Sequence, residues 1–293
     1  MLLDKLKSLL REPPPSMAFE ISETGVAGAR TGSRAEVAFE PLKPGALAVS
    51  PLHDNVADEA ELARAVRAVV GSGAKKGRDV AVILPDFCTR TSVLDFDSFP
   101  SEAKEQLALI RFRSKRSVPF DVETAMVSYW AQPASHKKVD VLAVMAPTEI
   151  VTRYEAPFRA VGLYPGFVTT SALAALELAP ESGISLMAKL SGRVLTVLVR
   201  EKSVLKLVRC LEMPSAGLED IAGVLAPTLV YVEDNLGSKA DKLLLCGFGA
   251  RTEEAARMFA EEFGVETEAV RSPLGVPGES NAGLLGYLRA VGN

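Results

Sequence analysis

The feature that most constrains the fold is an order of elements that occurs twice along the chain. Each copy has three short strand-like segments separated by turns, then a helix, then a continuous apolar strand of the kind buried on both faces. In the first copy these are residues 17–21, 26–30, 35–39, a helix that begins at Asn55 or Asp58, and 80–84. In the second copy they are residues 184–190, 194–200, 204–210, 217–236 and 242–246. Because residue identities differ, the repeat is one of architecture, and it predicts two α/β units.

Composition excludes several classes of function. The 293 residues, of which 48% are hydrophobic and 24% charged, suffice for two cores. A net charge of -4 argues against a nucleic-acid binder that neutralises phosphates broadly. Three widely spaced cysteines and only two histidines argue against a disulfide framework or a zinc site and fit a reducing cytoplasm. We find no apolar run long enough to span a bilayer and no signal peptide, and therefore expect a soluble protein.

The N-terminal segment, residues 1–15, is expected to be set off from the body. Leu2, Leu6, Leu9 and Leu10 share one face of a short amphipathic helix, and three prolines follow it as a stiff spacer. The helix either folds back on the core or makes a weak contact with a membrane surface or a partner, and the pattern favours neither alternative.

Residues 91–165 predict a compact insert in the first unit. A strand at 91–96 leads into a helix with Ala103, Leu107 and Ile110 on one face, and two further strands and a helix follow. Pro157 should kink or shorten that last helix, as Pro227 should interrupt the helix at 217–236.

The first helix of the insert ends in a basic run. The run consists of Arg111, Arg113, Lys115 and Arg116. Such cations at a solvated helix end complement the helix dipole. The alternatives are that the run binds phosphate or nucleic acid, or that it contacts acidic lipid or an acidic partner segment. The acids Asp86, Asp95, Asp97 and Glu102 match no metal-ligand spacing, and turn and cap roles are expected for them.

Four segments carry a resemblance to a known family. They are VAVILPDFCTRTSVLDFDSFP, IRFRSKRSVPFDVETAMVSY, LLLCGFGA and NAGLLGYLRA. Together with the element order they resemble the PilM family of type IV pilus assembly proteins, over nearly the whole chain after Ser16. The resemblance implies an α/β protein of the actin-like (ribonuclease H-like) ATPase superfamily with duplicated domains, at 16–90 and 166–293. It also implies an FtsA-type α+β insert at 91–165 and a second helical subdomain reduced to one helix.

The resemblance also implies a partner. PilM-like proteins bind the cytoplasmic N-terminal tail of PilN, an inner-membrane pilus protein, in a groove at the first domain and its insert. We therefore expect Arg90, Phe96, Arg111 and Arg113 to contact such a tail. The protein would be cytoplasmic, peripheral to the inner membrane, and in contact with the inner-membrane assembly platform. Contact with the membrane itself is possible, and no nucleic-acid partner is expected.

Actin-like proteins cradle ATP with two hairpin turns and a glycine pair. The matching positions here are Ser22, Thr24 and Gly25 in the first turn, Lys189, Ser191 and Gly192 in the second, and Gly247 and Gly249 after the later strand. The Asp expected at the start of each hairpin is missing, because the first hairpin begins at Glu20 and the second has Ala188 and Lys189 there. We therefore assign no catalytic or metal-ligating residue. ATP is possible, with magnesium only if ATP is bound, although tight turns need glycine and polar residues for structural reasons alone.

The resulting prediction is a scaffold of the pilus assembly platform with a degenerate nucleotide site. Two alternatives stay open: an active actin-like ATPase or kinase, and a scaffold of type II secretion or cell division with the same fold.

Overall fold

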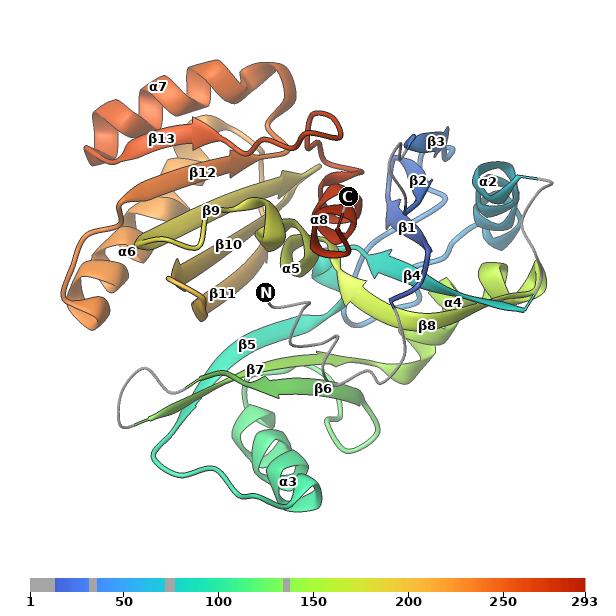
Figure 1. Ribbon diagram of the computed structural model, residues 1–293, viewed down its shortest axis with the longest axis horizontal. Helices are drawn as coiled ribbons and strands as arrows, with labels where there is room; N and C mark the ends of the chain where they lie inside the picture. The colour runs from blue at the N-terminus through green and yellow to red at the C-terminus, as the bar shows by residue number, and fades with distance from the viewer. Residues whose placement is uncertain (1–13, 32–35, 72–76, 134–137, 293) are drawn as a thin grey trace.

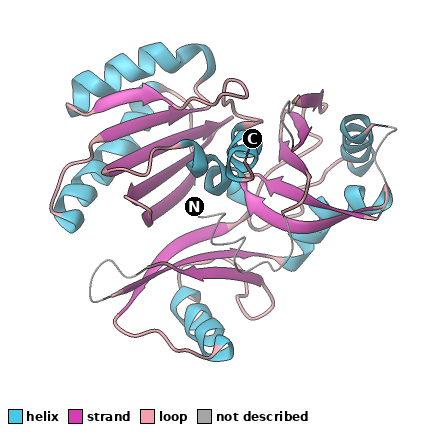
Figure 2. Cartoon of the chain, viewed as in Figure 1, coloured by secondary structure: helices cyan, strands magenta, loops and turns pink. Residues whose placement is uncertain are grey.

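The first five-stranded sheet is built around a meander to which two parallel strands are added. The computed structural model describes residues 14–31, 36–71, 77–133 and 138–292 (Figures 1 and 2), so the predicted helix at the N-terminus lies outside the described residues. In spatial order, β3-β2-β1-β4-β8, the strands are β3 (Ala38–Pro41), β2 (Gly25–Arg30), β1 (Met17–Ser22), β4 (Arg78–Leu84) and β8 (Leu163–Thr170). β1 pairs antiparallel with β2 and parallel with β4, which in turn pairs parallel with β8.

The second sheet repeats this arrangement. Its order, β11-β10-β9-β12-β13, has the same parallel and antiparallel pairings. The strands are β9 (Ile184–Ser191), β10 (Val194–Glu201), β11 (Val204–Glu212), β12 (Lys242–Cys246) and β13 (Glu266–Ala269). The predicted duplication of the α/β unit is therefore confirmed.

Helices cover both faces of each sheet. They are α2 (Glu59–Val70) and α4 (Thr148–Ala160) on the first sheet, α6 (Leu218–Leu236) and α7 (Thr252–Phe263) on the second, and α5 (Ser171–Ala175) and α8 (Ala282–Ala290) between them (Figure 1). The described residues also form short 3-10 turns, η1 (Asp86–Cys88), η2 (Leu176–Leu178) and η3 (Gly249–Arg251).

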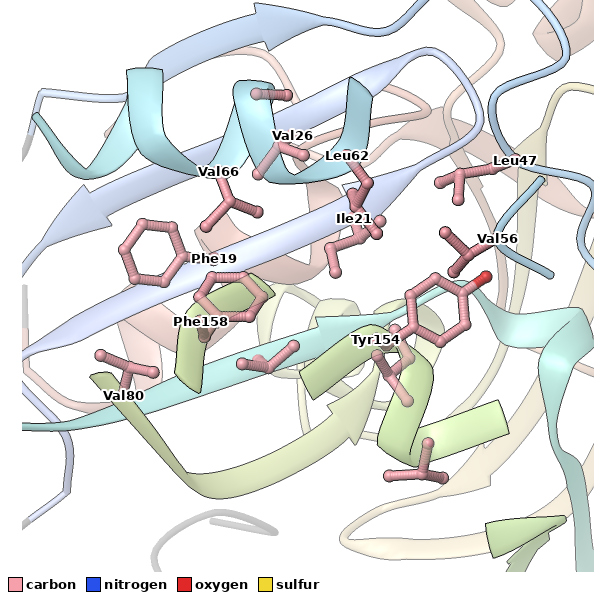
Figure 3. Close-up of a cluster of buried hydrophobic side chains, with 14 of the residues drawn as sticks. Phe19, Ile21, Val26, Leu47, Val56, Leu62, Val66, Val80, Tyr154 and Phe158 are labelled. Carbon is pink, nitrogen blue, oxygen red and sulfur yellow. The ribbon is translucent and has the colours of Figure 1, made fainter. Parts of the chain in front are cut away.

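The core of the first unit shows why β1 is buried along its whole length. Because side chains alternate across a strand, Phe19 and Ile21 face α2 and α4, while Ala18 and Glu20 face α8. Figure 3 shows Phe19 against Phe158 of α4, with ring centroids 5.1 Å apart. Tyr154, also of α4, buries its hydroxyl by donating a hydrogen bond to Asn55 Oδ1 at 3.0 Å.

The insert is a three-stranded antiparallel sheet with one helix. The sheet has the order β5-β7-β6, with β5 (Arg90–Phe96), β6 (Met126–Ala131), β7 (Val139–Ala146) and α3 (Ala103–Ser114). It also docks on the second unit, because the Gln132 side chain both donates to the carbonyl and accepts from the N–H of Leu205 at 2.7 Å.

Two expectations about the insert and its neighbours need correction. The predicted insert, 91–165, included α4 and the start of β8, but α4 packs into the first core through Ile150, Tyr154 and Phe158, and β8 completes the first sheet. Their apolar faces are complementary to the first sheet, which local patterns do not reveal. The sequence also predicts that Pro227 interrupts its helix, but α6 continues through it; α4 likewise continues through Pro157, which does not shorten that helix.

Candidate functional site

A cluster of buried charges lies where the two units meet. Glu20 of β1 and Lys189 of β9 both sit on the strand faces that α5 and α8 cover. Lys189 is 1% exposed, and its Nζ lies 3.0 Å from Oδ2 of Asp86, which follows β4. Thr196 of β10 donates to the same carboxylate oxygen at 3.2 Å. A buried ion pair therefore joins the first unit to the second.

The two carboxylates also cap two helices. Oδ1 of Asp86 accepts the N–H of Ala172 in the first turn of α5 at 2.7 Å. Oε2 of Glu20 accepts the N–H of Leu284 in the first turn of α8 at 2.7 Å, and its other oxygen accepts the hydroxyl of Ser171. Helix N-termini are natural anion sites because their N–H groups lack intrahelical partners. Here the anions that occupy them belong to the chain itself.

Burial and ion pairing shift the pKa values of Glu20 and Lys189 in opposite directions. Burial raises the pKa of the Glu20 carboxyl, and the attraction of Lys189 offsets this only in part. Burial by itself lowers the pKa of Lys189, but Asp86 and Glu20 outweigh it, so the net pKa is raised. Lys189 is therefore a permanent cation at neutral pH.

A second concave feature lies between the first unit and the insert. It is a groove of about 420 Å³, which we call the insert groove, and its walls come from the ends of β6 and β8 with α4 beside them. Both β6 and β8 are edge strands of their sheets (Figure 1). Its lining is mainly apolar with one cation, and includes Met126, Val151, Val168 and Arg111.

Comparisons with known proteins bear on the fold. No protein-family model matches the chain, and no curated protein matches it in sequence. Among solved structures, a chain of the PilM-PilN type IV pilus biogenesis complex matches with a TM-score of 0.79 at 17% identity, over 96% of this chain and 100% of that one. A Bacteroides thetaiotaomicron protein of unknown function with an actin-like ATPase fold matches with a TM-score of 0.55 at 13% identity, over 96% and 97%. The chain has the actin-like ATPase fold.

A third solved structure extends the set of neighbours. The cytoplasmic domain of EpsL, an inner-membrane component of the Vibrio cholerae type II secretion system, matches over 78% of this chain and 80% of its own, with a TM-score of 0.49 at 16% identity.

In the predicted first turn, the polar side chains interact with other groups of the same turn. Ser22 Oγ donates to the carbonyl of Gly25 at 3.0 Å and lies 3.0 Å from Thr24 Oγ1. A Cβ at Gly25 would lie 2.4 Å from the Phe39 ring, so the glycine is needed for the approach of β3. The polar groups proposed for phosphate binding thus have partners within the turn or serve packing.

The predicted second turn contacts Glu279, a residue that the sequence did not single out. Ser191 Oγ donates to the Glu279 carbonyl at 2.9 Å, and the Gly192 N–H donates to its carboxylate at 3.1 Å. Gly247 has a φ of 79°, and a Cβ there would lie 2.0 Å from the Leu190 carbonyl oxygen. Gly249, by contrast, opens η3 and lies against open space.

The cleft between these turns does not fit a nucleoside triphosphate as it stands. Its cavity is about 20 Å³, room for little more than a water molecule, whereas ligand pockets are usually several hundred Å³. Glu20, Glu23, Asp86 and Glu279 all line it, and their charge opposes a polyphosphate. Within the described ranges, no three His, Cys, Asp or Glu side chains are grouped as metal ligands would be.

Sequence reasoning missed the Asp86 and Glu20 roles, although one signal was present. Lys189 stands in a strand whose other residues are apolar or serine, and a buried ammonium needs a buried carboxylate. Which carboxylate it would meet could not be read from the pattern.

The four residues predicted to contact a partner do not share one surface. Arg111 lines the insert groove, donating to the Ala125 carbonyl at 3.4 Å. Phe96 is 5% exposed and belongs to the core of the insert, and Arg113 lies over its ring at 5.2 Å. Arg90 lies over the ring of Phe87, which lines the cleft between the units.

Among the described residues, no helix has the length and apolar content that crossing a bilayer requires.

The raised pKa of Glu20 predicts a pH-dependent contribution to stability. Because the folded state holds this proton more tightly than the unfolded state, the contribution is fully present below the ordinary pKa of 4.5 and is lost as pH rises through the folded pKa. The unfolding free energy of the wild type should therefore fall with pH relative to that of Glu20→Gln. Urea unfolding between roughly pH 4 and 8 measures the difference. Glu262→Gln, at an exposed site, is the control, and parallel curves for wild type and Glu20→Gln would contradict the prediction.

Proposed function

We propose that this protein is a scaffold of a type IV pilus inner-membrane platform that binds the cytoplasmic tail of a PilN-like protein in the insert groove. It would act at the cytoplasmic side of the inner membrane, with a nucleotide site that is degenerate. The solved neighbour with a TM-score of 0.79 comes from a PilM-PilN complex, which supports this choice of partner.

The observation that carries the proposal is the pair of strand edges beside the insert groove, those of β6 and β8, which no other described strand pairs with. An extended peptide can add a strand to such an edge, where main-chain hydrogen bonds give affinity and side-chain pockets give specificity. Met126, Val127 and Ser128 of β6 form one wall, and Val168, Thr169 and Thr170 of β8 form the other. A peptide lying between them would meet a free edge on either side.

Arg111 supplies a polar anchor in this apolar groove. Its Nε is buried and has no hydrogen-bond partner among the described residues. A buried donor without a partner is costly, and a carbonyl or carboxylate of a bound tail would satisfy it.

The cleft between the units supports the degenerate nucleotide site. Lys189, the residue expected to bind phosphate, is held by Asp86, and the N-termini of α5 and α8 hold carboxylates of the chain itself. Nucleotide entry would require this network to open. We therefore propose that partner binding needs no nucleotide.

Calorimetry with a synthetic peptide of the co-encoded PilN-like protein's N-terminal tail tests the proposal. We expect binding without nucleotide, unchanged by ATP and magnesium, and weakened at least tenfold by Met126→Glu or Val168→Glu, which place a charge in the apolar groove. Tyr164→Glu is the matched control, because Tyr164 lies on β8 outside the groove and is 50% exposed, close to the 49% of Met126. Binding that depends on ATP, or equal affinities in the groove and control variants, would contradict it.

A further inference from the structure

The outer side of α3 combines an exposed aromatic ring with cations that form no ion pair with any described residue. Phe112 is 75% exposed, although the rest of the helix buries Ile110 and half-buries its other large apolar side chains. Lys104 and Ala108 lie on the same side of the helix at a spacing of four residues, Lys115 and Arg116 follow its last turn, and all four are exposed. We call these five residues the α3 patch.

The charge of the α3 patch is opposite to that of the whole chain. No ion pair holds Lys104, Lys115 or Arg116 within the part of the chain that the structure describes. Two exposed acids, Glu102 and Glu105, lie at the N-terminal end of the helix, and Glu105 is two turns from Phe112. Arg113, next to the patch, faces Asp95 at 3.7 Å. A local excess of cations in a chain of net charge -4 points to an anionic partner.

We infer that the α3 patch contacts an anionic lipid surface. In Figure 1, α3 lies at the outer end of the insert, away from the cleft between the units, so the ring is carried on a projecting helix. Lysine and arginine beside an exposed aromatic ring suit the boundary of lipid headgroups and acyl chains, where the cations meet phosphates and the ring inserts between lipids.

The position of the patch adds a second reason. Arg111 lines the insert groove, while Phe112, the next residue, points to solvent. A helix is about 10–12 Å across, so a tail in the groove and lipid at the patch would be one helix width apart. This step rests on the proposed function: a tail that emerges from a membrane brings that membrane to the same end of the insert.

Such a contact is weak alone and effective when tethered. Each lysine or arginine near an anionic surface strengthens binding by about fivefold, and added salt screens the effect. Attachment through a membrane-anchored partner would raise the local lipid concentration and make weak partition sufficient.

Vesicle sedimentation with the full chain and no partner peptide tests the inference separately from the proposed function. We expect the wild type to bind vesicles of phosphatidylglycerol mixed with phosphatidylcholine, to bind pure phosphatidylcholine vesicles much less, and to lose binding as salt rises. Phe112→Ser should lower the partition coefficient about tenfold and Lys115→Glu with Arg116→Glu at least twentyfold.

Two control variants match these changes elsewhere on the surface. Val276→Ser removes an exposed apolar side chain, and Lys239→Glu with Arg257→Glu makes the same change of net charge in the second unit. Equal binding by patch and control variants, or no preference for anionic lipid, would overturn the inference. So would retention on immobilised polyglutamate without vesicle binding, which would assign the patch to an acidic protein segment. Circular dichroism of each variant checks folding.

Discussion

Replacing Gly286 by alanine is expected to destabilise the folded protein by about 3 kcal/mol or more, the upper end of what overpacking costs. A Cβ at this position would lie 2.0 Å from the carbonyl oxygen of Ala174 and 2.6 Å from its carbonyl carbon. Both atoms are backbone, so no rotamer change relieves the clash, and α8 must move away from α5. That movement would also pull Leu284, Tyr287 and Leu288 out of the core on the first sheet.

Gly223→Ala is the matched control, because Gly223 also lies within a helix but has nothing within 4 Å of the position that an added methyl group would take. Alanine there should stabilise the protein by about 0.5–1 kcal/mol, since it removes only the flexibility of glycine. Urea unfolding of the three proteins gives the comparison. A loss of less than about 1 kcal/mol in Gly286→Ala would mean that α8 is not packed on α5 as described.

Lys189→Met should cost about 3–5 kcal/mol of unfolding free energy at neutral pH, the range found when one partner of a buried ion pair is removed. The substitution leaves Asp86 and Glu20 buried without their cation. Adding Asp86→Asn should restore part of the loss, because it removes the uncompensated charge while keeping an acceptor for the Ala172 N–H. Lys43→Met, at a 75% exposed side chain paired with Glu61, should change stability by less than about 1 kcal/mol.

This experiment also separates two roles of Lys189. If the role of Lys189 were to bind a phosphate, Lys189→Met would leave the unfolding free energy nearly unchanged and would abolish nucleotide binding. A large loss of stability, partly recovered in the double variant, would identify it as the link between the two units. Denaturant titration together with calorimetry against ATP and magnesium distinguishes these results.

The duplicated fold could be predicted because its signals are local. Strand alternation, the apolar strands at β4 and β12 and the turn residues between the meander strands are properties of neighbouring residues, and both copies formed as the pattern indicated. The sequence also indicated a turn at Gly25. It did not show why glycine is needed there, which is the close approach of the Phe39 ring.

Only the tertiary structure determined which of these elements contact one another and through which residues. Lys189 and Asp86 are 103 residues apart, and the local sequence around neither residue predicts that the two form an ion pair. The same holds for Glu20, which caps a helix 264 residues away, and for α4, which joins the first core rather than the insert. Local sequence determines which backbone a segment prefers and which face it buries. Which buried charge meets which, and which edges enclose a groove, depends on the packing of segments far apart in the chain.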